Sequence, residues 1–202
     1  MMFYLLQHPS ERIYRYAWKD ESFIGCQRSQ CEECGRTVSS IEYRGSHHLI
    51  VEGGPKYPDH LAFCGAGEPL FVISERAARI FREHELSGIT EFIPIRVAKE
   101  ITSTLVPLPE TAPNYVLVQI VGRIDLDHGK MCLKKKRVCK TCGGFEWNRQ
   151  RMNPLYMDES TWDGSDICRN ESIPGYIIFS KAAVDLVKKY KLKGFSFEPL
   201  DR

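Results

Sequence analysis

Residues 71–95 have the sequence FVISERAARIFREHELSGITEFIPI, and residues 177–200 have the sequence IIFSKAAVDLVKKYKLKGFSFEPL. Each stretch begins with a short apolar run that ends in a serine, Ser74 in the first and Ser180 in the second. Serine is a preferred N-cap residue, and apolar residues follow each one at helical spacing before a second apolar run. The two stretches therefore predict the same unit twice: a strand, a serine-capped helix and a closing strand.

Two shorter segments repeat in the same order. Residues 3–7 (FYLLQ) return as residues 115–119 (YVLVQ), and the turn at residues 31–35 (CEECG) returns at residues 139–143 (CKTCG). The offsets between the copies are 112, 108 and 106 residues, so the order is kept and only loop lengths differ. Such a fixed order indicates an internal duplication. We expect an α+β fold made of two pseudo-equivalent halves that share one core.

A glycine follows each predicted helix, Gly88 in the first unit and Gly194 in the second. Glycine at the C′ position takes the positive φ that ends many helices, and the apolar residue after it packs back on the last turn. We therefore expect Gly88 and Gly194 at C′, with Ile89 and Phe195 at the next position.

The repeat also divides the chain into domains. We expect an N-terminal half at residues 1–106, with the first CxxCG turn, and a C-terminal half at residues 115–202, with the second. Residues 107–114 contain three prolines and are suited to connect the two halves.

Composition limits the class of protein. A chain of 202 residues with 43% hydrophobic residues can bury a substantial core. The net charge of +2 favours neither nucleic acid nor a strongly acidic partner. The sequence lacks a signal peptide and an apolar run of membrane-spanning length, so we expect a cytoplasmic protein. In that compartment the eight cysteines are expected to be thiols or metal ligands rather than disulfides.

The paired CxxCG turns predict a metal site. A CxxC turn places two sulfur atoms on one side of a tight loop, where both can reach one Zn²⁺ at about 2.3 Å. Equivalent turns in two halves related by a pseudo-twofold axis can meet at that axis. We expect one structural zinc ion per chain, with no open position for water. Its four ligands would be Cys31, Cys34, Cys139 and Cys142.

Two alternatives stay open at this point. In the first, the turns hold no metal. In the second, each half has its own four-cysteine site, formed by Cys26, Cys31, Cys34 and Cys64 and by Cys132, Cys139, Cys142 and Cys168. Cys64 and Cys168 follow apolar residues, where a cysteine is usually a small buried hydrophobe. His47 and His48 could replace a cysteine ligand, although an exposed or capping role suits them better.

A basic run precedes the second turn. It consists of Lys130, Lys134, Lys135, Lys136 and Arg137. A basic edge beside a zinc turn can contact phosphates of nucleic acid. Lysines also protect strand edges against edge-to-edge pairing, and the aromatic residues that single-strand binding needs are missing from this run. We favour the interpretation as a solvated strand edge.

Acidic residues surround Trp162 after the second turn. They are Asp158, Glu159, Asp163 and Asp166. This mixture is typical of a partner-binding loop, but it is equally typical of a polar loop anchored by one tryptophan.

Catalytic motifs are missing from the sequence. It contains no glycine-rich phosphate loop, HExxH or GxSxG. The zinc deaminase signature needs His-x-Glu before its CxxC, and none of the six histidines has a glutamate two positions later. We expect a binding protein rather than an enzyme.

The two CxxCG turns, together with the terminal segment at residues 178–200, resemble the double-CXXCG family. The resemblance spans nearly the whole chain. Some members of that family act as immunity proteins for bacterial contact-dependent toxins. The terminal strand, serine-capped helix and Gly-x-x-Phe-x-Pro strand also resemble wider immunity families of polymorphic toxin systems. The resemblance implies an antitoxin that binds and neutralises a cognate bacterial toxin, and it gives Cys64 and Cys168 no ligand role.

An immunity protein needs a protein-binding surface. Interfaces of this kind bury about 1,600 Å² and depend on a few aromatic or arginine side chains. The first candidates for such contacts are Trp147, Arg151, Tyr156 and Trp162. The alternative function is a zinc-ribbon protein that binds nucleic acid through the basic run or acts as a regulator. We expect a protein partner rather than nucleic acid or a membrane.

Overall fold

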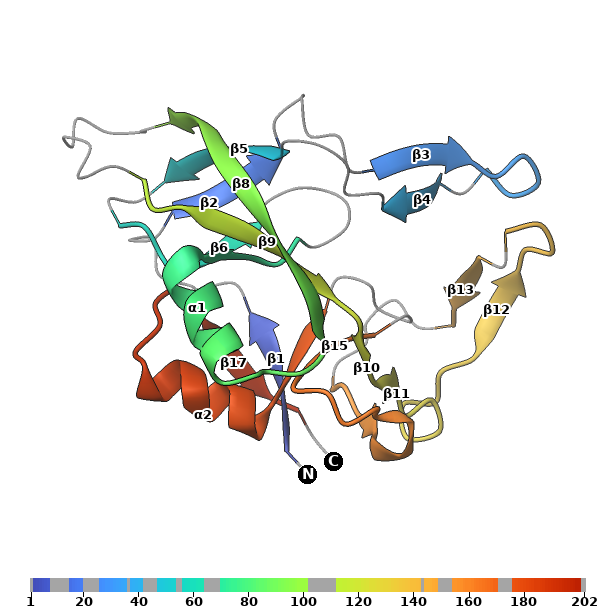
Figure 1. The fold of residues 1–202 in the computed structure, drawn as a ribbon. Coiled ribbons are helices and arrows are strands. Elements are labelled where there is room, and N and C mark those ends of the chain that lie inside the picture. The colour runs from blue at the N-terminus through green and yellow to red at the C-terminus, as the bar shows by residue number, and fades with distance from the viewer. Residues whose placement is uncertain are drawn as a thin grey trace.

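The computed structural model describes residues 2–7, 15–19, 26–35, 37–41, 47–53, 56–63, 70–101, 112–142, 144–148, 154–170 and 176–200. Within these residues the protein has a mixed α+β fold with two α-helices and several β-sheets (Figure 1). The predicted α+β class is confirmed. No helix of the described part is long and apolar enough to cross a membrane.

A five-stranded sheet forms one part of the body, in the order β10-β15-β16-β1-β17. Its strands are β10 (Gly122–Arg123), β15 (Ile167–Arg169), β16 (Ile177–Ser180), β1 (Phe3–Gln7) and β17 (Ser196–Pro199). β1 is antiparallel to both of its neighbours, and β15 is antiparallel to β16 and parallel to β10.

A closed barrel forms the other part, in the order β2-β5-β8-β9-β7-β6. Its strands are β2 (Arg15–Lys19), β5 (His47–Gly53), β8 (Ile89–Ile101), β9 (Tyr115–Ile120), β7 (Val72–Ser74) and β6 (His60–Phe63). β9 is antiparallel to β7 and β8, whereas β2 is parallel to β6 and β5 is parallel to β8. β8, the closing strand after the first predicted helix, continues to Ile101, six residues beyond the repeated stretch that ends at residue 95.

One strand is exchanged in each direction between the two parts of the chain. β1, near the N-terminus, lies between β16 and β17 of the C-terminal segment. β9 follows the predicted connector but lies between β7 and β8 of the N-terminal segment. The residues on each side of the connector thus contribute to both sheets, and the connector itself is described only at 112–114.

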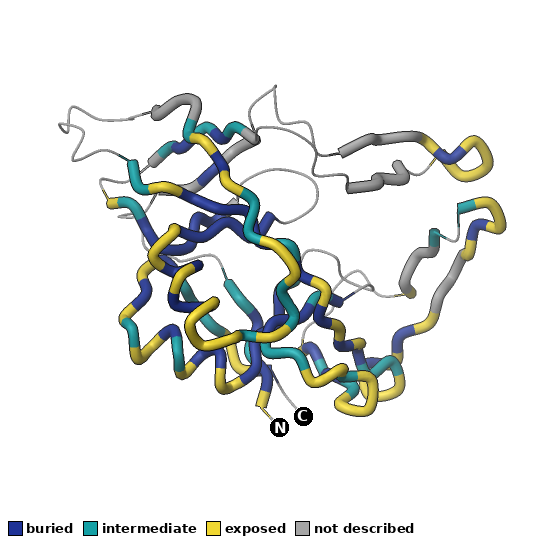
Figure 2. The backbone as a smooth tube through the Cα atoms, in the orientation of Figure 1, coloured by how far each residue is buried: buried dark blue, intermediate teal, exposed yellow. Residues whose placement is uncertain are grey.

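The two helices begin where the sequence predicts. α1 (Glu75–Glu83) and α2 (Lys181–Lys189) follow Ser74 and Ser180, whose hydroxyl oxygens accept hydrogen bonds from the backbone N–H groups of Ala77 and Ala183. One buried cluster joins the apolar faces of both helices to side chains of β7, β9, β15 and β16. Figure 2 shows these inner faces as buried and the outer faces as exposed.

The helix ends differ from the prediction. Glu85 and Lys191 take the positive φ at C′, and Gly88 and Gly194 lie three residues further on. The Leu86 N–H donates to the Phe81 carbonyl at 3.0 Å, and the Glu85 N–H donates to the Arg82 carbonyl at 3.0 Å, which is a Schellman motif. The second helix ends in the same way. The assignment of the glycines to C′ is therefore wrong.

The two glycines instead allow another segment of backbone to pass close by. A Cβ atom on Gly88 would lie 2.1 Å from the Ile167 carbonyl oxygen, and one on Gly194 would lie 2.6 Å from the His60 carbonyl oxygen. Their φ angles are +87° and +82°. Each glycine is required both by its conformation and by a contact between the two parts of the chain.

The positive φ at a non-glycine residue gives a first prediction. Left-handed backbone costs an L-residue roughly 1–2 kcal/mol, whereas glycine adopts it freely but loses more entropy on folding. We expect Glu85→Gly to raise the free energy of unfolding by about 0.5–1 kcal/mol in urea denaturation. The control is Glu83→Gly in the last turn of α1, which should lower it by up to about 1 kcal/mol. Equal destabilisation by both changes would contradict the assignment of Glu85 to C′.

Two aspartates join the helix starts to the loops after the opposite helices. Asp59 Oδ1 accepts from Ser74 Oγ at 2.7 Å, and its Oδ2 accepts from the Lys193 N–H at 2.8 Å. Asp166 Oδ1 accepts from Ser180 Oγ at 2.8 Å, and its Oδ2 accepts from the Ser87 N–H at 3.1 Å. Each carboxylate thus links a helix cap in one part of the chain to a loop in the other.

These contacts make the capping serines more important than ordinary caps. Ser74 is buried, caps α1 and donates to Asp59. We expect Ser74→Ala to lower the free energy of unfolding by about 2 kcal/mol, because it removes a cap and leaves a buried carboxylate oxygen without a donor. Ser160→Ala in the exposed 3-10 helix η1 (Glu159–Thr161) is the control, with a change of about 0.5 kcal/mol or less. Chemical denaturation of both variants gives the comparison, and equal losses would contradict this role.

Two hairpins extend from the body. β3 (Cys26–Gln30) pairs with β4 (Thr37–Ile41), and β12 (Lys135–Val138) pairs with β13 (Phe145–Trp147). Each pair forms a two-stranded sheet of its own within the described residues, and the tips of the hairpins lie opposite each other (Figure 1). A further short pair, β11 (Asp125–Leu126) and β14 (Met157–Asp158), lies at the base of the second hairpin.

Candidate metal centre

The CxxCG turns form the tips of the two hairpins. In the first, Cys31 follows β3, and the Gly35 N–H donates to the Cys31 carbonyl at 2.8 Å while Gly35 takes a φ of +68°. In the second, the Cys139 N–H donates to the Gly144 carbonyl at 2.8 Å, and the Gly144 N–H donates to Cys142 Sγ at 3.4 Å. These bonds fix each turn and aim its two sulfur atoms to the same side.

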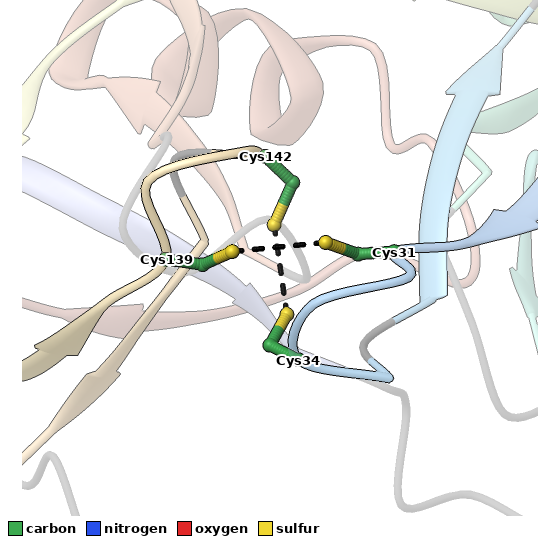
Figure 3. Close-up of side chains that lie close together, drawn as sticks. All are labelled: Cys31, Cys34, Cys139 and Cys142. Carbon is green, nitrogen blue, oxygen red and sulfur yellow. Dashed lines mark hydrogen bonds between the residues drawn. The ribbon is translucent and has the colours of Figure 1, made fainter.

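The four sulfur atoms of the turns lie together. They come within 4.8 Å of one another, with 3.6 Å between Cys31 and Cys139 and 3.7 Å between Cys34 and Cys142 (Figure 3). A tetrahedron of sulfur atoms at about 2.3 Å from a zinc ion has edges of about 3.8 Å. The four thiols of the two CxxCG turns therefore lie together, as predicted, and could hold a metal ion.

Burial differs between the two members of each turn. Cys31 and Cys139 are buried, whereas Cys34 is exposed and Cys142 is half-buried. The centre thus has a covered side and a side that faces solvent, and a metal ion could enter without opening of the body.

Polar contacts perturb the thiols. Backbone N–H groups of Cys34 and Glu33 donate to the sulfur of Cys31 and lower its pKa to about 7. The backbone N–H of Cys142 acts in the same sense on Cys139, but burial and the neighbouring Glu33 carboxylate outweigh it and raise the pKa of Cys139 to about 12. Hydrogen bonds from Thr141 and then Cys139 lower the pKa of Glu33. The aimed N–H groups favour thiolate, the form that binds metal.

The alternative with one site in each half is wrong, because all four turn cysteines belong to one cluster. Cys168 is buried among the apolar residues around Phe3 and Ile178, and its Sγ donates to the Ser165 carbonyl at 3.4 Å. Burial raises the pKa of Cys168 to about 12, as expected for a buried thiol. Cys132 is exposed.

Four other candidate ligands are not part of the cluster that the structure describes. The Cys26 and His47 side chains and all of Cys64 lie outside the described residues. His48 is half-buried on β5 and is not a member of the cluster.

The predicted partner-binding residues occupy different environments. Trp162 is half-buried, donates from its indole N–H to the Ser165 carbonyl at 2.9 Å, and packs edge-on against Phe3. Tyr156 is also half-buried and packs against the apolar cluster that contains Phe3. Trp147 belongs to β13 with its side chain outside the described part, and Arg151 lies outside it entirely. Their partner-binding role stays a prediction.

Three of the acidic residues near Trp162 accept hydrogen bonds from within the protein. Asp158 caps η1 through the Ser160 N–H. Asp163 accepts from the N–H groups of Ser165 and Arg123, both at 2.9 Å. With Asp166 bound to Ser180 and Ser87, this pattern favours the polar loop anchored by a tryptophan.

Two features escaped the sequence interpretation. The first is the pair of links made by Asp59 and Asp166, which come directly before β6 and β15. Glu33, inside the first turn, bonds to Thr141 at the corresponding position of the second turn. A CxxC pattern names the ligands but gives no signal for the residues between them.

Comparison with known proteins gives no assignment. No protein-family model matches the chain, and no curated protein matches it. The resemblance to the double-CXXCG family therefore rests on the motifs quoted above.

Proposed function

We propose that the chain is a metal-stabilised binding protein whose centre holds one structural Zn²⁺. The observation that carries this proposal is the set of four thiols within 4.8 Å of one another. Four soft thiolate ligands suit zinc, and they fill a tetrahedral site without leaving a position for water or substrate. We expect about one zinc per chain by elemental analysis of protein purified without added metal. The proposal would be contradicted if the purified protein contained no metal and its stability were the same with and without a chelator.

We further propose that the chain consists of two pseudo-equivalent halves, with the metal on their pseudo-twofold axis. The strand order supports this, because β1 lies between β16 and β17 as β9 lies between β7 and β8. Reciprocal contacts of corresponding residues, which are typical of a twofold interface, also support it. They are Cys31 with Cys139, Cys34 with Cys142, and His84 with Tyr190, whose Nε2 and Oη atoms are 2.7 Å apart.

The function that we propose is that of a cytoplasmic immunity protein, which binds and neutralises one cognate toxin. The support is the resemblance of the paired CxxCG turns and the terminal unit to the double-CXXCG family. A closed metal centre agrees with this proposal, because it stabilises a scaffold without supplying chemistry of its own. Binding would depend on surface side chains presented by the duplicated body.

Co-expression tests this function. Each open reading frame next to the gene is expressed in a sensitive host with and without this protein. We expect one neighbour to kill the host alone and to be tolerated when this protein is present. A Gly194→Ala variant, which should not fold stably, serves as the negative control for protection. Equal killing with and without the protein, for every neighbour, would reject the immunity function.

The second hairpin supports one other candidate function. Lys134 and Lys140 are exposed on this hairpin, and β12 carries Lys135, Lys136 and Arg137 between them. Nucleic-acid binding through these residues would weaken steeply with salt, with a slope of about −0.9 per neutralised phosphate on duplex DNA. A gel-shift series at two salt concentrations separates the candidates, and no binding at low salt removes this one.

A further inference from the structure

One carboxylate links the two CxxCG turns beside the thiols. Glu33 lies in the first turn, and its Oε2 accepts from Thr141 Oγ1 at 2.6 Å and from the Thr141 N–H at 3.2 Å. The Cys139 thiol lies 3.3 Å from the same oxygen. Three donors from the second hairpin therefore converge on one oxygen atom of the first.

This contact constrains orientation as well as distance. A backbone donor and a side-chain donor of the same residue cannot both reach Glu33 unless the second turn faces the first in one way. Because Glu33 and Thr141 occupy corresponding positions of CEEC and CKTC, their contact lies beside the two cysteine pairs that cross between the turns.

The hairpins need such a contact because each forms its own two-stranded sheet. Isolated two-stranded hairpins are marginally ordered in water, so a metal ion that had to bring two free tips together would lose affinity to the ordering of both. A bond that holds the tips in register beforehand removes part of that cost.

The negative charge of Glu33 acts in the opposite direction. Four thiolates around Zn²⁺ carry a net charge of about −2, and a carboxylate beside Cys139 repels them. Metal binding also removes the Cys139 proton, so the contact between the Cys139 sulfur and the Glu33 carboxylate changes from attraction to repulsion. The two Thr141 donors remain in the metal-bound state. The hydrogen bonds and the charge can therefore be separated by substitution.

We propose that Glu33 is a positioning residue that holds the second CxxCG turn against the first through Thr141 and so pre-forms the metal centre. This inference rests on the proposed zinc site. Metal ligands are commonly oriented by such outer contacts, whose removal typically costs 10–100-fold in metal affinity.

The test compares zinc affinities by competition with a chromogenic chelator. We expect Glu33→Ala to weaken zinc binding about 10-fold or more. Glu32→Ala, in the same turn and also exposed, is the matched control and should change affinity by about twofold or less. Glu33→Gln keeps an acceptor oxygen without the charge and should restore most of the affinity. Equal affinities of the Glu33→Ala and Glu32→Ala proteins would overturn the inference, and wild-type protein that binds no zinc would instead reject the proposed metal.

Thr141 supplies an independent check. The Glu33→Ala and Thr141→Ala changes should not be additive in zinc affinity, because they remove the same contact, whereas Thr141→Ser should behave as wild type. In metal-free protein, hydrogen exchange at the Thr141 amide should be faster in Glu33→Ala than in Glu32→Ala. Additive effects, or unchanged exchange at this amide, would contradict the positioning role.

Discussion

Gly194→Ala is expected to destabilise the protein by about 4 kcal/mol or more. The added Cβ would lie 2.5 Å from Pro58 Cβ and 2.6 Å from the His60 carbonyl oxygen, and neither neighbour is the end of a flexible side chain. The positive φ of +82° adds backbone strain. Relief would require the loop after α2 to move away from β6, which would also break the bond between Lys193 and Asp59. Guanidinium denaturation, with circular dichroism as the signal, measures the loss.

The matched control for Gly194→Ala is Gly164→Ala. Gly164 has a φ of +90°, but a Cβ there would meet no atom within 4 Å. The control therefore carries the backbone strain without the collision and should cost about 1–2 kcal/mol. Gly88→Ala should behave like Gly194→Ala because its Cβ would lie 2.1 Å from the Ile167 carbonyl oxygen. Similar losses of stability in Gly164→Ala and Gly194→Ala would show that the loop after α2 does not pack against β6 as described.

Metal removal is expected to disorder the two hairpins and leave the body folded. Chelation or Cys142→Ser should increase hydrogen exchange at least about 10-fold in peptides 26–41 and 135–148, since a two-stranded hairpin alone is marginally stable. Peptides 71–95 and 177–200 should keep their protection. The body retains its exchanged strands, its common cluster and the Asp59 and Asp166 contacts, none of which involves the metal centre.

Cys132→Ser is the control for metal removal, because this exposed cysteine lies outside the cluster. It should retain the metal and the exchange pattern of the wild type. Simultaneous loss of protection in the hairpins and the body would contradict the expected result. The metal would then be the main link between the two parts of the chain, as its position on both CxxCG turns suggests from sequence alone.

The helix caps and the cysteine cluster were predictable from the sequence. The caps at Ser74 and Ser180 follow from a serine before an apolar helical pattern, and both occur. The meeting of the four cysteines was predicted from the expected duplication, which would relate the two turns and allow them to share one centre.

The close backbone contacts and the strand pairing between segments far apart in the sequence were not predictable in the same way. Gly88 resembles a C′ glycine in sequence, but a side chain there is excluded by the Ile167 backbone, which is remote in sequence. The strand exchange leaves no trace in the pattern either, because β1 and β9 are similar apolar segments that would suit either sheet. Choosing between those pairings requires the loop lengths and the packing of both sheets together.

The exchanged strand β1 has a consequence for synthesis of the protein. Phe3–Gln7 is synthesised long before β16 and β17, which are both of its neighbours in the sheet. At about 5–20 residues per second, this apolar strand waits roughly 10–35 s for its partners. The barrel likewise stays open until β9 has been made. The nascent chain therefore passes through a long period with unpaired strand edges, in which a chaperone that covers β1 would increase the yield of folded protein.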